Sequence, residues 1–175
     1  MTEAQLSNAM DAYGSTVYRL ALTRMQNIAD AEDVYQEVFL RLWKQAAEDW
    51  DGDRAKAWLI RTTLNRCADL HRFRLRRPVL SFAEIPDLAQ PEDERRELWE
   101  AVSRLPEKAR TAVHLYYAEG YSAEEISQLM HIPAATVRTR LHRARKQLKE
   151  LLGGIDDETC VSRSDGTNFG PQRAE

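Results

Sequence analysis

The chain has 175 residues, of which 43% are hydrophobic and 30% are charged, and its formal net charge at pH 7 is −3. This balance is typical of a soluble globular protein and excludes an intrinsically disordered chain. No apolar run approaches the roughly 20 residues that a membrane-spanning helix needs, so we expect no membrane insertion. The length accommodates one domain or two small ones.

Neither the amino terminus nor the cysteines indicate secretion or a metal site. The first residues lack the basic-then-apolar layout of a secretion signal. Cys67 and Cys160 lie far apart in the sequence and form no metal-like cluster with the four histidines. We therefore expect a cytoplasmic protein that holds no metal and no other cofactor.

The small net charge conceals strongly charged segments. Residues 54–77 carry eight lysines and arginines against one acid, whereas residues 30–53 carry eight acids against two basic residues. Residues 81–100 carry seven acids against two arginines. Such segregation predicts separate basic and acidic surfaces, and a basic surface is a candidate for binding a polyanion.

Apolar residues recur at helical spacing along most of the chain, and no run of alternating β-branched residues is present, which predicts an all-α protein. A first helix is expected over residues 4–26, with Gly14 interrupting its pattern. The next turn contains Asp30, which is able to cap a second helix over residues 31–47.

The expected helix 31–47 has two distinct faces. Its inner stripe consists of Val34, Tyr35, Val38, Leu42 and Ala46. A second face gathers, at three- and four-residue spacing, Asp33, Gln36, Glu37, Leu40, Arg41 and Lys44. Phe39 and Trp43 lie between the faces, either in the core or at the edge of a contact surface. The polar face is either solvated or, given Leu40 and the nearby aromatic rings, a protein-docking surface.

A loop is expected over residues 48–56, followed by a basic helix over residues 57–74 that Pro78 ends. Cations beside aromatic rings suit a single-stranded nucleic acid, because cations follow the phosphates while rings stack on the bases. In the alternative interpretation, Trp58 belongs to the core and the arginines face solvent.

Prolines and acids without a sustained period indicate a linker over residues 79–91. A short helix over residues 92–104 is expected to turn Leu98, Ala101 and Val102 inward. The next helix, residues 107–119, carries Ala109, Ala112, Val113, Tyr116 and Tyr117, and it ends at Gly120. Residues 153–175 have scarcely any apolar period, which predicts a disordered tail.

Residues 121–152 follow a helix-turn-helix pattern. Ser122 and Glu125 form a capping box for the first helix, and Pro133 breaks the run, so a second helix follows a three-residue turn. Its inner face consists of Val137, Leu141, Ala144, Leu148 and Leu151. Six lysines and arginines and no acid lie between residues 136 and 149. Such like charges favour duplex DNA binding over a helical hairpin with a solvated basic face.

Three segments resemble, in the same order, parts of bacterial sigma-70-family factors. DAEDVYQEVFLRLWK (residues 30–44) is similar to their polymerase-binding segment, and AWLIRTTLNRCADLHR (residues 57–72) to their promoter-melting segment. LPEKARTAVHLYYAEGYSAEEISQLMHIPAATVRTRLHRARKQL (residues 105–148) is similar to their region-four DNA-binding domain. The short linker and the lack of a third domain resemble the extracytoplasmic-function subgroup.

The resemblance implies two small helical domains: region 2 over residues 1–78 and region 4 over residues 92–152. The positions that meet the clamp helices of the polymerase β′ subunit are then Asp33, Gln36, Glu37, Arg41 and Trp43. Those that meet the melted promoter strand are Trp50, Arg54, Lys56, Trp58, Arg61, Asn65, Asp69 and Arg72. Those that meet duplex DNA are Ala135, Thr136, Arg138, Thr139, His142, Arg143 and Lys146.

The resemblance also implies partners: core RNA polymerase, promoter DNA in duplex and single-stranded form, and an anti-sigma protein. Phosphoryl chemistry would belong to the polymerase, so no enzyme activity is expected of this chain. Pro133 stands where the family often has a Ser-like cap, so the start of the recognition helix is open by a residue or two. Either Arg138 or Thr139 is then the residue that reads a base.

Two other functions stay open on the sequence alone. A transcriptional regulator that binds duplex DNA through a helix-turn-helix explains residues 121–152 equally well. This function does not explain the acidic face of helix 31–47 or the basic residues of segment 54–77. A nucleic-acid enzyme would need a metal cluster, a nucleophile–base pair or a phosphate loop, and the sequence contains none of these patterns.

Overall fold

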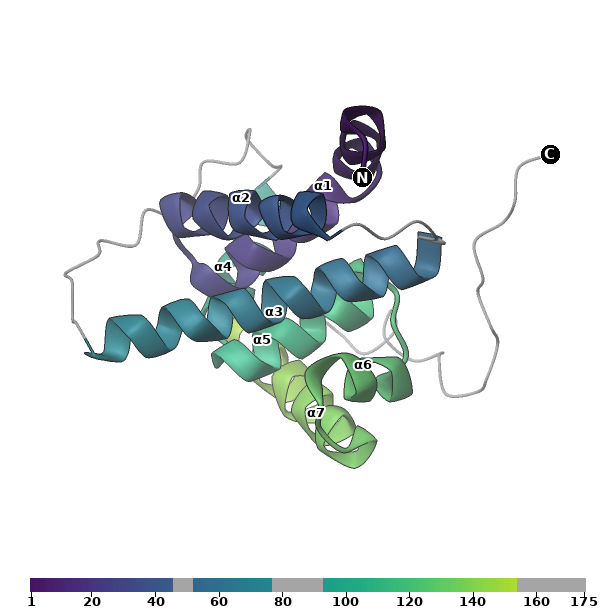
Figure 1. Cartoon of the computed structure of the whole chain (residues 1–175). Coiled ribbons are helices and arrows are strands. Elements are labelled where there is room, and N and C mark those ends of the chain that lie inside the picture. The colour runs from purple at the N-terminus through teal and green to yellow at the C-terminus, as the bar shows by residue number, and fades with distance from the viewer. Residues whose placement is uncertain (46–51, 77–92, 154–175) are drawn as a thin grey trace.

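A computed structural model describes residues 1–45, 52–76 and 93–153, and within these ranges the regular elements are all helical. The elements are α1 (Glu3–Met25), α2 (Ile28–Lys44), α3 (Gly52–Arg76), α4 (Asp93–Ser103), α5 (Glu107–Val113), the π-helical turn η1 (His114–Ala118), α6 (Ala123–Met130) and α7 (Ala134–Leu151). Figure 1 shows their arrangement in space. The all-α prediction is confirmed. No helix in these ranges is long and apolar enough to span a membrane.

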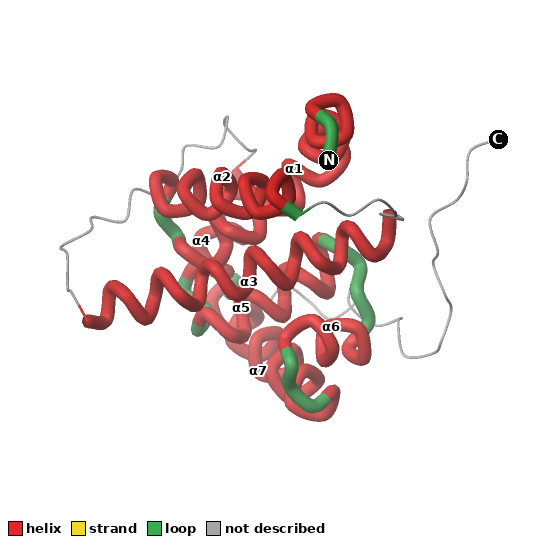
Figure 2. The backbone as a smooth tube through the Cα atoms, in the orientation of Figure 1, coloured by secondary structure: helices red, strands yellow, loops and turns green. Residues whose placement is uncertain are grey.

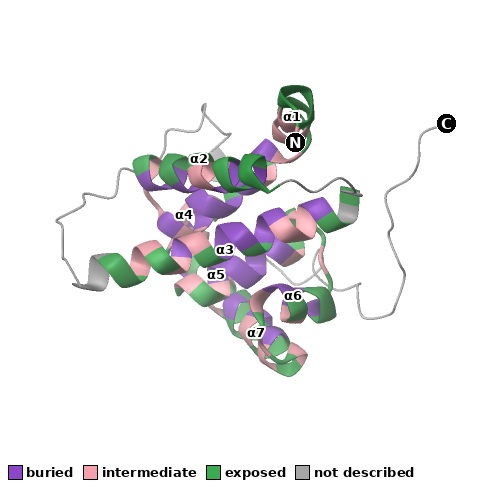
Figure 3. Cartoon of the chain, viewed as in Figure 1, coloured by how far each residue is buried: buried purple, intermediate pink, exposed green. Residues whose placement is uncertain are grey.

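Helices α1, α2 and α3 pack together and form what we call the amino-terminal bundle. Its core contains Val17, Leu22, Val34, Val38, Phe39, Leu42 and Leu59. Phe39 is therefore a core residue, whereas Trp43 is 41% exposed. The middle of α3 is mostly buried (Figure 3), whereas Arg72 and Phe73 further along the helix are exposed.

Helix α1 runs through Gly14, as the expected first helix over residues 4–26 does. A Cβ atom at Gly14 would lie 3.0 Å from the Tyr35 hydroxyl, so the glycine lets α2 approach closely. The cap of α2 is Asn27 rather than Asp30: the Asn27 side chain accepts a hydrogen bond from the Asp30 backbone N–H, and α2 begins at Ile28.

Helix α3 begins earlier than expected. It starts at Gly52, so Arg54 and Lys56 lie on its first turns and not in a loop. The Tyr13 hydroxyl donates a hydrogen bond to the Gly52 carbonyl oxygen at 3.0 Å, which ties this start to α1. Ala55 is buried and gives the first turn an inward-facing residue, which explains why the helix extends here. Trp50 and Ala46 lie outside the described residues.

Helices α4 to α7 form the carboxy-terminal bundle. Leu105, Ala112, Leu115, Ile126, Leu129, Val137 and Leu141 share its core. Ser122 and Glu125 form the predicted capping box at the start of α6. Residues 131–133 form the predicted short turn (Figure 2), in which His131 adopts the left-handed conformation that ends α6.

Leu98 and Leu151, which the sequence predicts to face inward, are 48% and 37% exposed, and Tyr117 is 55% exposed. The π-helical turn adds a residue to the helical period, so His114 and Leu115 face inward while Tyr117 faces solvent. On α4, Ala101 is buried whereas Leu98 is exposed, and Leu151 lies in the last turn of α7.

The two bundles pack directly against each other. Leu20 of α1 and Ile60 and Leu64 of α3 belong to the same buried cluster as the core of the carboxy-terminal bundle. Helix α5 contacts α1, and α6 contacts α3. The prediction of two helical units is thus confirmed, and the structure adds a shared core that joins them.

Candidate nucleic-acid and protein interfaces

The outer face of α2 presents polar and apolar groups together. Asp33, Gln36, Arg41 and Trp43 are exposed, and Glu37 is half-buried. The Arg41 Nε donates a hydrogen bond to Glu37 Oε1 at 3.0 Å. Leu40, on the same face, is 47% exposed. The structure brings the five predicted docking residues onto one helix, and exposed Leu40 and Trp43 give that surface an apolar component.

A groove of about 390 Å³ separates the end of α2 from α3. It is lined by Arg41, Lys44 and Gln45 from α2 and by Trp58, Thr62 and Asn65 from α3. Trp58 is half-buried: it packs against the core and also lines this groove. The groove joins Arg41 of the predicted docking set to Trp58 and Asn65 of the predicted single-strand set.

Beyond this groove, α3 exposes further predicted single-strand residues. Arg54 and Arg61 are exposed. Near the end of the helix, Arg72 Nη2 donates a hydrogen bond to Asp69 Oδ1 at 2.5 Å, which lowers the charge that this pair offers to a ligand. Phe73 is 55% exposed beside them, and the sequence interpretation did not single it out. Its position among arginines in HRFRLRRP was the signal available.

Lys56 faces away from the other predicted strand-binding residues. Its Nζ lies 3.0 Å from Glu119 Oε2 and 5.3 Å from the centroid of the Tyr121 ring. Both of these partners belong to the carboxy-terminal bundle. The structure therefore separates Lys56 from the groove that contains Asn65. Neither Glu119 nor Tyr121 was singled out in the sequence, because their roles depend on how the bundles pack.

Helix α7 exposes most of the predicted duplex-binding residues. Val137, Leu141 and Ala144 are buried, as predicted. The opposite side exposes Ala135, Arg138, Thr139, His142, Arg143 and Lys146, and Thr136 is half-buried. Arg138 forms an ion pair with Glu124 at the start of α6, an acidic partner that the sequence interpretation missed. The Thr139 hydroxyl donates to the Ala135 carbonyl oxygen at 2.9 Å.

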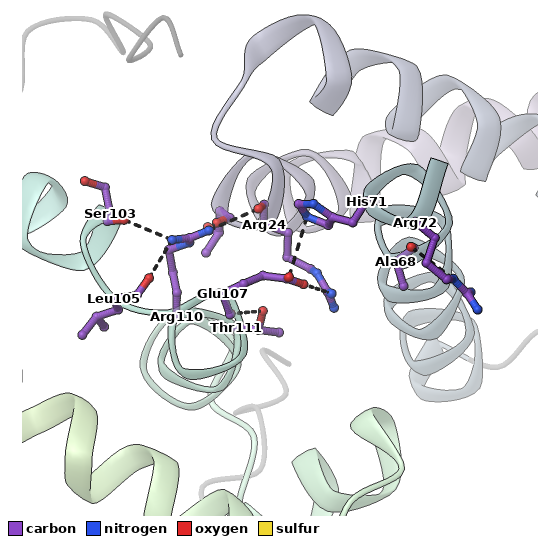
Figure 4. A network of polar contacts seen from close by, with 10 residues as sticks. Arg24, Ala68, His71, Arg72, Ser103, Leu105, Glu107, Arg110 and Thr111 are labelled. Carbon is purple, nitrogen blue, oxygen red and sulfur yellow. Dashed lines mark hydrogen bonds and ion pairs between the residues drawn. The ribbon is translucent and has the colours of Figure 1, made fainter. Parts of the chain in front are cut away.

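The boundary between the bundles contains a network of hydrogen bonds centred on Arg110 (Figure 4). This side chain is buried and donates to four backbone carbonyl oxygens, those of Thr23, Arg24, Ser103 and Leu105. Arg24 forms an ion pair with Glu107, and His71 Nε2 lies 3.8 Å from the other oxygen of that carboxylate. Two helix ends from different bundles are thus held by one guanidinium.

A second polar cluster on this boundary contains His114 and Glu119. His114 Nδ1 lies 3.2 Å from the Thr23 hydroxyl, and His114 Nε2 lies 3.8 Å from Glu119 Oε1. Burial lowers the pKa of His114, the Glu119 carboxylate opposes this shift and Arg19 adds to it. The neutral imidazole is therefore the favoured form in the folded chain.

The described residues offer no groups of His, Cys, Asp or Glu that could hold a metal ion. Cys67 is buried, and burial raises the pKa of its thiol to about 12, so this thiol stays protonated and unreactive at neutral pH.

Two protein-family models match this chain. Residues 9–77 match the family described as Sigma-70 region 2, and residues 95–148 match Sigma-70, region 4. Each match covers one of the two bundles.

Two relatives with similar sequences are ECF RNA polymerase sigma factors. The chain is 34% identical over 161 residues to the ECF RNA polymerase sigma factor SigE of Mycolicibacterium smegmatis. This alignment covers 86% of this chain but only 62% of SigE. It is 30% identical over 155 residues to the ECF RNA polymerase sigma factor SigM of Bacillus subtilis, covering 83% of this chain and 94% of SigM.

A solved structure supports the fold. The sigma factor RpoE from Bartonella quintana, in complex with the anti-sigma factor NepR, aligns with a TM-score of 0.73 and 24% sequence identity. The alignment covers 87% of this chain and 99% of that one.

Proposed function

Because the chain belongs to the sigma-70 family of RNA polymerase sigma factors, in the ECF subgroup, we propose that it binds core RNA polymerase and directs it to specific promoters. The observation that carries this proposal is the groove between α2 and α3, where the candidate docking surface meets the candidate strand-binding surface. The chain itself performs no phosphoryl transfer in this proposal. Its task is to bind, orient and open DNA for the polymerase, in the cytoplasm.

The docking surface for the polymerase is the exposed face of α2. Asp33, Gln36, Glu37, Arg41 and Trp43 contact the clamp helices of the β′ subunit. Support comes from the exposure of Leu40 and Trp43 among charged groups, because an interface needs an apolar centre within a polar rim. The side chains of the Glu37–Arg41 ion pair are 34% and 42% exposed to solvent, so exchanging this pair for contacts with a partner costs little.

The melted promoter strand lies along α3. Trp58 and Asn65 receive an unstacked base in the groove, and Arg54, Arg61 and Arg72 follow the phosphates, with Asp69 holding Arg72. An aromatic wall beside an amide side chain suits a base, because the ring accepts stacking while the amide offers both a donor and an acceptor. Base extrusion costs a few kcal/mol, which these contacts and the polymerase together supply.

Duplex DNA is bound by α7, with the side chains of Arg138, Thr139 and His142 turned to base edges and Arg143 and Lys146 turned to phosphates. The support is the exposed basic face of a helix whose opposite side is buried in a helix-turn-helix. The domain boundaries that fit this division are residues 1–78 and 92–152.

We further propose an anti-sigma partner, since RpoE from Bartonella quintana is similar in fold and its structure contains the anti-sigma factor NepR. Such a protein would compete with polymerase for the α2 face. Cross-linking in cells that recovers a small partner in one growth condition and polymerase in another supports this. Recovery of polymerase alone under all conditions contradicts it.

Transcription with purified core polymerase tests the main proposal. Genomic fragments of the source organism serve as templates, and the 5′ ends of transcripts are sequenced with and without the chain. Start sites that depend on the chain and share two sequence elements are expected. If the chain binds duplex fragments but no new start site arises, it is a polymerase-independent regulator instead.

A further inference from the structure

The guanidinium of Arg138, the candidate base reader, has an acidic partner in the free chain. Its Nη2 forms an ion pair with Oε1 of Glu124, and the two residues come from the two helices of the helix-turn-helix. Glu124 lies in the first turn of α6, whereas Arg138 lies in the second turn of α7. An acid at this place needs an explanation, because both helices of such a motif approach the polyanionic duplex.

The position of Arg138 on α7 explains why its side chain reaches α6. Long side chains on a helix point back toward its amino terminus, so Arg138 extends over Ala134 and Ala135, one turn earlier. Both of these side chains are single methyl groups, which occupy little space and accept no hydrogen bond. The Glu124 carboxylate supplies the acceptor that α7 itself does not offer in this direction.

Folding gives little reason for an acid at position 124. The capping box of α6 consists of Ser122 and Glu125: Glu125 Oε2 accepts from the Ser122 backbone N–H at 2.8 Å, and the Ser122 hydroxyl accepts from the Glu125 backbone N–H at 3.2 Å. The side chains of Glu124 and Arg138 are 60% and 61% exposed, so their ion pair adds little to stability. Glu124 is left with a favourable but modest interaction with the dipole of α6.

The ion pair leaves most of the Arg138 fork available. Arginine has five N–H donors in a rigid plane, and Glu124 pairs with a single nitrogen, Nη2. Two parallel N–H groups are enough to read the O6 and N7 acceptors of a guanine in the major groove. A carboxylate behind the fork limits its rotation, which lowers the entropy lost when the fork meets a base edge. The same negative charge opposes contacts between the start of α6 and phosphate oxygens.

We propose that Glu124 is a positioning residue for Arg138, which orients the guanidinium toward one guanine of the promoter duplex and disfavours contacts with phosphates. This inference rests on the proposed function, in which Arg138 faces a base edge. Glu124 stays paired with Arg138 in the DNA complex, where the exclusion of water strengthens the pair. Sequence preference at this promoter position therefore depends on two residues, one from each helix of the helix-turn-helix.

The test measures binding of the full chain to a randomised duplex library and to one duplex of unrelated sequence, at fixed salt. Glu124→Gln keeps the size of the side chain and removes its charge. The preference for the base that Arg138 reads should fall about fivefold, the low end of what a bidentate contact contributes. Affinity for the unrelated duplex should rise about threefold, because a negative charge near the phosphates is lost. Weaker binding to both kinds of duplex would overturn the proposal.

The matched control is Glu150→Gln, which removes the same charge from an exposed position near the end of α7. This residue lies more than three turns beyond Arg138 along the helix, so the base preference should stay unchanged. An equal loss of preference in the two variants would show that the total charge of the bundle, and not the contact with Arg138, determines the effect, and would overturn the proposal.

A double-mutant cycle shows whether Glu124 acts through Arg138. In an Arg138→Ala background, Glu124→Gln should no longer change the preference at this position. If it still does, Glu124 reads a base itself and the positioning role is wrong. If Arg138→Ala relaxes the preference and Glu124→Gln does not, the proposal is overturned while base reading by Arg138 stands. If Arg138→Ala leaves the preference unchanged, base reading by Arg138 is wrong and the inference is overturned with it.

A second variant, Glu124→Asp, covers the case in which Glu124→Gln is poorly folded. It keeps the charge but shortens the side chain by one methylene, which moves the carboxylate away from Arg138 Nη2. The base preference should fall as in the Gln variant, whereas affinity for the unrelated duplex should stay within about twofold of the parent chain. Unchanged preference in this variant, with a circular dichroism spectrum that matches the parent, would overturn a role that depends on the contact.

Discussion

The Nε of Arg110 donates a hydrogen bond to the backbone carbonyl oxygen of Thr23, across the boundary between the two bundles. Thr23 lies in the last turn of α1, where carbonyl oxygens lack intrahelical partners, and Arg110 also donates to the next carbonyl oxygen, that of Arg24. A guanidinium at a helix carboxy terminus is favourable for the helix dipole as well. The end of α1 is therefore completed by a residue of the other bundle.

Replacing Arg110 by Ala should lower the free energy of unfolding by about 3 kcal/mol, because it removes charge-assisted hydrogen bonds and leaves buried carbonyl oxygens without a donor. Urea denaturation followed by circular dichroism measures this change. Arg104→Ala, an exposed change in the neighbouring turn, should cost less than about 0.5 kcal/mol. Equal effects of the two substitutions would show that the network contributes little.

His114 should make stability depend on pH. Burial lowers its pKa in the folded chain below the unfolded value of about 6.5, so below that pH the unfolded chain binds the proton more readily than the folded one. The free energy of unfolding should therefore fall as the pH drops below about 6.5, until the folded imidazole also titrates. Above pH 7 this residue adds no pH dependence.

Urea denaturation at pH 7.5 and pH 5.5 measures this effect, with His114→Gln as the comparison. Gln fills a similar position near Thr23 and Glu119 but does not titrate. Carboxylates far from residue 114 contribute equally to both proteins, so the difference between the two pH profiles reports on the imidazole and its contact with Glu119. Parallel profiles for the two proteins would contradict a buried neutral His114.

Local sequence features predicted the helices and the helix-turn-helix well. The capping box of Ser122 with Glu125 and the break at Pro133 are local, so spacing alone placed α6 and α7 within a residue or two. The start of α2 was misplaced because Asn27 and Asp30 are both good caps, and only the hydrogen bond to the Asp30 N–H decides between them. Competing local signals of this kind are resolved by tertiary packing.

The contacts between the two bundles could not be predicted from the sequence. Arg110 and Glu119 belong to a residue class that is usually exposed, and nothing near them in sequence supplies their partners. Arg110 bonds to carbonyl oxygens of Thr23 and Arg24, which any residue type would offer. The π-helical turn at His114, which directs Tyr117 to solvent, likewise has no sequence pattern that distinguishes it from an α-helix.

The α2 face should be required for polymerase binding. Replacing Asp33, Gln36 and Glu37 together by Ala should weaken binding to core polymerase on the order of a hundredfold, because charged partners at an interface are lost together. Equilibrium binding to purified core enzyme measures this change. A variant with Asp11→Ala and Glu97→Ala loses the same two negative charges elsewhere and should bind normally. Equal affinities of the two variants would reject this docking surface.

Asn65 should act in opening the promoter. Asn65→Ala should reduce open-complex formation on duplex promoter DNA several-fold, because the groove loses its amide contact to the extruded base. A template with a pre-melted bubble removes the unstacking cost and should restore part of the activity. Permanganate footprinting on both templates provides the measurement. An identical deficit on the two templates would mean that Asn65 acts elsewhere, for example in folding.

Base reading and phosphate contact should separate along α7. Arg138 lies in the amino-terminal part of the helix, which meets base edges in helix-turn-helix proteins, and Lys146 lies two turns further along. The helix begins at Ala134, and the Thr139 hydroxyl already donates to the Ala135 carbonyl oxygen, which favours Arg138 over Thr139 as the base reader. Glu124 pairs with Arg138 in the free chain and must release the guanidinium, or share it, when DNA binds.

Arg138→Ala should therefore cost roughly 1–3 kcal/mol of binding free energy and relax the preference at one promoter position. Lys146→Ala should weaken binding to all sequences alike and reduce the log–log salt slope by about 1, because it removes one phosphate contact. Binding of the full chain to a randomised duplex library across a salt series measures both quantities. Thr139→Ala serves as the control for register: a loss of preference there, with Arg138→Ala silent, would move the reading position by one residue. If none of the three substitutions changes preference or slope, α7 does not lie in the major groove.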